Sequence, residues 1–115
     1  MDIVAPSQQV MEAALELRSV RARLLAQNVA NADTPGYMAR DVDFKSAINA
    51  MLAQDGAQAS GQDAVLTLQN MRFDRNDVDL NQQMAKVDDN GLAYVATLKL
   101  YGDSMGRLQT ALSNS

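Results

Sequence analysis

A chain of 115 residues can form at most one domain, and a domain of this size buries only a modest core. Its net charge of -4 is mild, and ten basic residues are scattered among fourteen acidic ones, so no nucleic-acid partner is expected. The sequence has no Cys, which excludes disulfides and thiolate chemistry, and no His, which removes the commonest general base and transition-metal ligand. We therefore expect no cofactor, no metal site and no enzymatic activity.

The composition favours helix, because aromatic residues make up only 4% of the chain while Ala, Leu, Val, Met and Gln are abundant. We expect a mainly α fold in which long N- and C-terminal helices form a coiled coil beside a short, partly irregular middle segment. The sequence contains no apolar run long enough to span a membrane, and residues 1–30 contain no apolar stretch typical of a secretory signal. Neither a membrane span nor a cleaved signal peptide is expected.

The first expected element is a helix from residue 7 to residue 31. Apolar or small residues and one Gln recur there at steps of three and four, which places them on one stripe: Val10, Ala13, Leu17, Val20, Leu24 and Gln27. Ser7 follows Pro6 and can cap the start of this helix. Pro35 disfavours a helical conformation at Thr34, and Gly36 can adopt the positive φ of a type II turn, so the helix must end before them.

The middle of the chain predicts little regular structure. The apolar residues between Phe44 and Leu52 favour a short helix, which needs outside packing because short isolated helices are marginal. Residues 53–64 have the small, polar and Gly-containing composition of a flexible connector. Residues 65–68 can form a short extended piece, and residues 70–76 are expected to be irregular. We divide the chain at residues 37 and 76 into segments 1–37, 38–76 and 77–115 of one structural unit.

The C-terminal segment carries the most regular pattern in the sequence. Asp79 can cap a helix, and Gln82, three residues later, can complete a capping box. Apolar residues and one Gly then alternate at steps of four and three, as in a heptad repeat: Leu80, Met84, Val87, Gly91, Tyr94, Leu98, Tyr101, Met105, Leu108 and Leu112. The helix that carries them would be on the order of 50 Å long, which exceeds the width of a small domain.

These two helices predict contacts with other subunits. The second helix is longer than the first, and the open flanks of a two-helix pair carry further apolar residues: Met11, Leu25, Leu92, Val95 and Leu100. The alternative is a monomeric three-helix core in which residues 44–52 cover these flanks. We define the assembly seam as the side chains expected to mediate contacts with other subunits: Val10, Leu17, Leu24, Leu80, Met84, Val87, Tyr94, Leu98, Tyr101, Met105, Leu108 and Leu112.

The segment from residue 28 to residue 37 is the most specific stretch of the chain. Two Asn side chains one helical turn apart can bond backbone groups at a helix end, and the Pro-Gly turn then directs the chain onto an aromatic anchor. This N-x-x-N-x-x-T-P-G-Y pattern, with an Asn-x-Val-Asp-Leu stretch leading to a Met in the last helix, resembles the bacterial flagellar rod and hook family of axial proteins. The matching residues are Asn28, Asn31, Thr34, Pro35, Gly36 and Tyr37, and then Asn76, Val78, Asp79, Leu80 and Met84.

The resemblance implies a structural subunit of the flagellar basal body whose terminal helices stack into the axial drive shaft. The short interior implies a small proximal rod subunit, although the end helices do not distinguish one proximal rod subunit from another. The resemblance further implies export by the flagellar type III pathway without a cleaved signal peptide, and a place in the periplasmic rod. The implied partners are other rod proteins, copies of the same chain, the basal-body base and the export apparatus. Gln82, Gln83 and Met38 depart from the charged residues that the family often carries there.

Two other functions fit parts of the sequence. A soluble helical adaptor or chaperone would bind a partner helix in its groove, which the heptad pattern permits but which does not explain the turn at residues 28–37. An enzyme would need a carboxylate pair, either Asp41 with Asp43 or Asp77 with Asp79, but neither pair has a His, a Cys or a Gly-rich loop to complete a site. Helix capping and solvated turn charge are the favoured roles of these residues.

Overall fold

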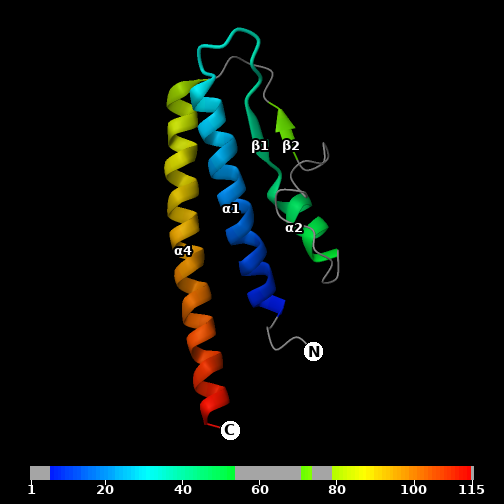
Figure 1. The fold of residues 1–115 in the computed structure, drawn as a ribbon, viewed down its shortest axis with the longest axis vertical. Helices are drawn as coiled ribbons and strands as arrows, with labels where there is room; N and C mark the ends of the chain where they lie inside the picture. Colours follow the sequence, from blue (N-terminus) through cyan, green and yellow to red (C-terminus); the bar gives the residue numbers. More distant parts are fainter. Residues whose placement is uncertain (1–5, 54–70, 74–78, 115) are drawn as a thin grey trace.

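A computed structural model describes residues 6–53, 71–73 and 79–114. Its elements are α1 (Pro6–Ala30), β1 (Arg40–Val42), α2 (Phe44–Ala53), β2 (Met71–Phe73) and α4 (Leu80–Ser113). The helices α1 and α4 run antiparallel along one another, and β1 and α2, which we call the arm, lie on the other side of α1 (Figure 1). The expected mainly α fold, with long terminal helices and a short middle segment, is confirmed.

The first helix begins one residue earlier than predicted. It starts at Pro6, so Ser7 lies inside α1 and the prediction that Ser7 caps the helix is wrong. Proline suits the first position because its fixed φ is already helical and an N–H there would have no partner within the helix. At the other end α1 stops at Ala30, and Gly36 has the expected positive φ, 77°. The chain therefore reverses between α1 and the arm.

The apolar core lies between α1 and the arm. The buried residues of α1 repeat at helical spacing and meet buried residues of β1 and α2: Leu17, Val20 and Leu24 with Val42 and Ala47. Phe44, Ile48 and Met51 pack against this cluster, so the short helix that the sequence predicted is the element that covers the stripe of α1. Ten residues of isolated helix would be marginal in water, and the outside packing that α2 needs is supplied by α1.

The middle segment holds two short strands that the sequence analysis did not predict. β1 and β2 pair antiparallel, with Asp41 opposite Arg72 at the centre of the register. The expectation of irregular chain over residues 70–76 is therefore wrong for Met71–Phe73, because a three-residue strand is too short to show an alternating pattern. Ala53 ends α2 and does not begin the connector. The rest of the expected connector, and the extended piece at 65–68, lie outside the described residues.

The last helix is capped as expected. Asp79 has extended backbone angles, and its side chain accepts hydrogen bonds from the amides of Asn81 at 3.0 Å and Gln82 at 3.4 Å. These bonds satisfy two of the amides that a helix start leaves without partners. α4 then continues for 34 residues. Among the described residues, neither α4 nor any other helix is long and apolar enough to cross a membrane.

Replacing Leu17 by Ala should lower the free energy of unfolding by roughly 2 to 5 kcal/mol, because it opens a cavity in the cluster between α1 and the arm. Leu92→Ala is the matched control: Leu92 is 72% exposed on α4, so its truncation should change the free energy by less than about 0.5 kcal/mol. Urea unfolding followed by far-UV circular dichroism measures both. Equal losses would contradict the packing of α1 against the arm.

Candidate assembly surface

The two buried side chains that α4 contributes are both polar, Gln83 and Asn90. Asn28 Nδ2 donates to Gln83 Oε1 at 3.0 Å, and each of these two side chains is only 1% exposed. Asn90 Nδ2 donates to the carbonyl oxygen of Arg18 at 3.0 Å, and Arg18 Nη1 donates to Asn90 Oδ1 at 3.4 Å. Side-chain hydrogen bonds therefore hold α4 against α1 at two separate levels.

Polar contacts continue toward the other end of the helix pair. Gln8 Nε2 donates to Ser104 Oγ at 2.9 Å, and at the edge of the contact the Tyr101 hydroxyl donates to the carboxylate of Glu12. We call six of these residues the polar ladder: Gln8, Arg18 and Asn28 of α1 with Gln83, Asn90 and Ser104 of α4. On α4 the ladder residues are separated by multiples of seven positions, which keeps them on one face of the helix.

The seam predicted on α4 lies largely outside this contact. We call its exposed part, whose side chains are 37% to 58% exposed, the outer stripe: Leu80, Met84, Val87, Leu98 and Leu112. The other seam residues of α4 are half-buried: Tyr94, Tyr101, Met105 and Leu108. On α1, Leu17 and Leu24 are buried, whereas Val10 is exposed. The face of α4 that meets α1 is thus turned by roughly a quarter of a helical turn from the outer stripe.

The apolar flanks divide between the two long helices. Leu25 of α1 is fully buried, and Met11 is half-buried. Leu92, Val95 and Leu100 of α4 remain well exposed. The arm packs on α1 and leaves these three α4 side chains exposed. The alternative of a three-helix core is therefore correct for the apolar stripe of α1, which α2 covers, and wrong for these residues of α4.

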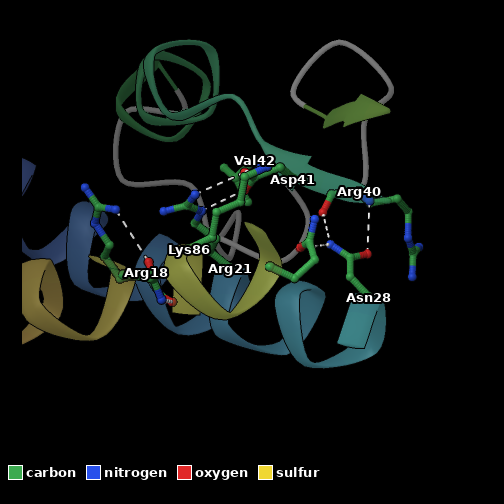
Figure 2. Close-up of polar contacts among 9 residues, drawn as sticks. Arg18, Arg21, Asn28, Arg40, Asp41, Val42 and Lys86 are labelled. Atoms are coloured by element: carbon green, nitrogen blue, oxygen red, sulfur yellow. Dashed lines mark hydrogen bonds and ion pairs between the residues drawn. The ribbon is translucent and has the colours of Figure 1, made fainter. Parts of the chain in front are cut away.

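The turn after α1 is built around Asn28. Its Nδ2 donates to the carbonyl oxygen of Arg40 at 2.7 Å, and its Oδ1 accepts from the Arg40 amide at 3.0 Å (Figure 2). The same Oδ1 accepts from the Tyr37 hydroxyl at 3.3 Å. Asn31 Nδ2 donates to the Gln27 carbonyl oxygen at 2.8 Å. Both Asn side chains thus bond backbone groups, as the motif predicted. Asn28 binds both the amide and the carbonyl oxygen of Arg40, as the backbone of a neighbouring strand would, and so fixes the start of the arm.

Three more members of the predicted motif lie on the surface. Thr34, Pro35 and Gly36 are all exposed at the end of the helix pair where α1 gives way to the arm. The Thr34 hydroxyl donates to Asn31 Oδ1 at 3.1 Å, so the turn is held from inside while its outer edge stays accessible.

A buried ion pair joins the arm to α1. Arg21 Nε and Nη2 donate to the two carboxylate oxygens of Asp41 at 2.7 and 3.1 Å, and Lys86 Nζ of α4 lies 3.8 Å from Asp41 Oδ2 (Figure 2). Burial alone would raise the pKa of Asp41. The hydrogen bonds from Arg21 and the Val42 amide, with the charges of Arg21 and Lys86, outweigh this effect and hold the pKa below its ordinary value.

Three residues of the two candidate carboxylate pairs lie in the described part of the chain, and each has a structural role: Asp41, Asp43 and Asp79. Asp41 is buried in its ion pair, so a solvated turn charge is the wrong description of it. Asp43 Oδ1 accepts from the Ser46 amide at the start of α2, and Asp79 caps α4, whereas Asp77 lies outside the described residues. No group of three or more Asp, Glu, His or Cys side chains within 6–53, 71–73 and 79–114 comes together to hold a metal ion.

Sequence reasoning missed the residues that hold the elements together, above all Arg21, Gln83 and Asn90. A signal for the last two exists, because Gln83, Asn90, Thr97 and Ser104 repeat every seven positions along a helix. Polar residues on an amphipathic helix normally face water, so this repeat gave no reason to place them inside. For Arg21 the sequence shows no signal, since its partner Asp41 is twenty residues away.

Beside the outer stripe, α1 and α4 enclose a shallow groove of about 390 Å³, whose lining is Arg18, Ser19, Ala22, Asn90, Gly91, Tyr94 and Val95. A Cβ added to Gly91 would meet no atom within 4 Å. Within the part of the chain that the structure describes, no contact therefore requires glycine at this position.

Comparison with known proteins gives a consistent set of relatives. The chain is 32% identical over 120 residues to flagellar basal body rod protein FlgB of Yersinia ruckeri, covering 86% of this chain and 88% of that protein. It is 34% identical to the protein of the same description from Aeromonas hydrophila, covering 86% of each. The Escherichia coli K12 protein of this description is 29% identical and aligns over 100% of this chain and 99% of its own length. No family model matches the chain.

Replacing Asp41 by Asn should lower the free energy of unfolding near neutral pH by on the order of 3 kcal/mol, because the Arg21 side chain, only 14% exposed, would lose its charged partner. The folded-state pKa of Asp41 is depressed, so the stability it contributes is complete above its unfolded pKa, near 4, and is lost as the pH falls through the folded pKa. Urea unfolding of both proteins across the acid range measures the difference.

Asp33→Asn is the matched control for this measurement, since Asp33 is exposed in the turn and its replacement should change the stability little at any pH. A difference between the Asp41 variant and the parent that did not shrink toward acid pH would contradict the role assigned to the ion pair.

Proposed function

The chain belongs to the FlgB family of flagellar basal body rod proteins, and from this premise we propose that it is a subunit of the proximal rod that assembles through its terminal helices. At the coarser level, the chain is a structural component of the basal body rod that assembles with other flagellar components, and it is not an enzyme. We propose in addition that α4 and the turn after α1 make its contacts with neighbouring subunits.

The observation that carries the proposal is the outer stripe. It is apolar, runs almost the full length of a 34-residue helix and is 37% to 58% exposed in the isolated chain. Burying each large apolar side chain would be worth up to roughly 1.5 to 3 kcal/mol, a gain that the chain leaves unused. The heptad spacing of the stripe is suited to packing against another long helix that lies side by side with α4.

The surroundings of the stripe support the same function. Gly91 lies in the groove between α1 and α4 and costs roughly 1 kcal/mol relative to Ala in a helix, although no contact among the described residues needs it. A neighbouring backbone that approaches closely would use the missing side chain. Contacts of this kind between different patches of successive copies generate a helical filament when the rotation from copy to copy does not close into a ring.

We assign the exposed turn, Thr34 to Gly36, a second contact. It lies at one end of the helix pair (Figure 1), where it can direct the middle segment, residues 38–76, across a neighbouring subunit. In the assembled rod the helices would form a drive shaft that transmits torque, with copies of this chain, other rod proteins and the basal-body base as neighbours. Delivery would be through the flagellar type III export apparatus into the periplasm, without a cleaved signal peptide.

Two alternatives fit less well. The first is a second kind of proximal rod subunit, the C-type relative, which has similar end helices. The Yersinia ruckeri, Aeromonas hydrophila and Escherichia coli relatives, however, are FlgB proteins. A soluble adaptor that grips a partner helix would also use an exposed apolar stripe, yet it gives no reason for the exposed Thr34-Pro35-Gly36 turn.

Replacing Leu98 by Glu should abolish rod assembly and swimming while leaving the isolated fold intact, because a charge would enter the outer stripe at an exposed position. Far-UV circular dichroism of the purified variant, motility in a strain that lacks the chromosomal gene, and electron microscopy of isolated basal bodies measure the effects. Ala96→Glu adds the same charge at an exposed position away from the stripe and should be tolerated better. Full swimming by the Leu98 variant would count against the proposal.

Replacing Tyr37 or Pro35 by Ala should impair assembly more than secretion, because both changes loosen the turn and neither touches the helical face that the stripe occupies. Immunoblots of secreted and rod-incorporated protein separate the two steps. Met38→Ala, at an exposed position next to the turn, is the control. Normal rods in both turn variants would show that the turn makes no contact needed for assembly.

A further inference from the structure

We propose that the polar ladder selects which face of α4 turns toward α1, and so withholds the outer stripe from the interior of the chain's own fold. The ladder residues are thus specificity determinants for helix pairing. This inference concerns pairing within one chain, goes beyond the proposed function, and does not depend on which partner covers the stripe.

Apolar burial alone would choose a different pairing. The outer stripe offers five large apolar side chains that stay exposed, whereas the fully buried side chains of α4 are Gln83 and Asn90, with Tyr94, Tyr101, Met105 and Leu108 half-buried. Transfer of apolar surface from water is favourable and has no direction, so by this term α4 would rotate its stripe inward. The observed rotation therefore needs a directional interaction, and hydrogen bonds are the directional interactions present.

The ladder supplies that direction because its members are satisfied only in this rotation. Among the described residues, no buried side-chain nitrogen or oxygen lacks a hydrogen-bond partner. Turning α4 by a quarter of a turn would take Gln83 away from Asn28 and Asn90 away from Arg18. Asn28, which is 1% exposed, would then keep a donor hydrogen in the interior without its acceptor, and such a loss costs more than the bond contributes when it is made. Single buried amides fix register in helix pairs by the same physics.

The rotation can be read by disulfide trapping, because the chain contains no Cys of its own. One pair, Gln8→Cys with Ser104→Cys, reports the ladder face, since these side chains touch in the structure. The other pair, Gln8→Cys with Met105→Cys, reports the neighbouring position of the predicted seam at the same level of the helix, about a quarter of a helical turn away. Under mild oxidation of the purified full chain, the first disulfide should form at least about tenfold faster than the second, given the strict geometry of disulfides.

The test compares this ratio of rates in the parent and in Gln83→Ala/Asn90→Ala, which removes the remote ladder amides without adding apolar surface. The ratio should fall several-fold toward equality in the variant while far-UV helicity is retained. Asn81→Ala/Gln82→Ala is the matched control, with the same residue types at exposed positions of the same helix, and should keep the parent ratio. A purely structural role would lower the melting temperature without changing which face is trapped.

Asn90→Ala alone keeps the experiment decisive if the double variant loses helicity, since it leaves the Asn28–Gln83 bond in place. Its ratio of disulfide rates should lie between the parent value and one, the value expected when neither face is preferred. An unchanged ratio in a folded variant, or the same fall in the Asn81→Ala/Gln82→Ala control, would overturn the inference. Neither outcome would bear on rod assembly, which the Leu98 variant tests separately.

Discussion

The amide of Asn28 binds the arm and α4 at once through a single side chain of α1. Its nitrogen donates both to the Arg40 carbonyl oxygen of β1 and to Gln83 Oε1 of α4, and its oxygen accepts from the Arg40 amide. One side chain of α1 thus binds partners 12 and 55 residues away in sequence. Because a buried amide without its partners costs more than a satisfied one contributes, these partners must be in place together. Formation of the arm and pairing of the long helices are coupled at this residue.

The coupling explains why the apolar surface is distributed as it is. α1 packs its apolar stripe against the arm and binds α4 through side-chain hydrogen bonds. Arg21, from the same helix, secures the arm a second time through Asp41. With its apolar stripe covered by the arm, α1 does not cover that of α4, and the outer stripe remains exposed. The accessible apolar face of the chain is therefore a consequence of how its polar groups are satisfied.

The features that the sequence predicts well are local ones. Periodicity identified both long helices and α2, and the Asp79 cap and the positive φ of Gly36 followed from residue type and position. The features it missed depend on contacts between distant residues. The pairing of β1 with β2, the Arg21–Asp41 ion pair and the Asn28–Gln83 bond each need the fold to bring their members together. The heptad pattern shows that a face of α4 is apolar, but periodicity alone does not say what the face contacts.

In this subunit, directional hydrogen bonds fix the fold within the chain, while apolar surface is left for contacts with other chains. This arrangement suits a subunit of an assembly. Hydrogen bonds made by Asn28 and Asn90 specify one rotation of α4, and they do so without using the apolar surface that association needs. Had the stripe closed onto α1, the chain would offer its neighbours less apolar surface, and polar surface gives up water with little net gain. A polar interior contact thus lets one short chain fold with a defined shape and still keep, along a 34-residue helix, the surface that favours association.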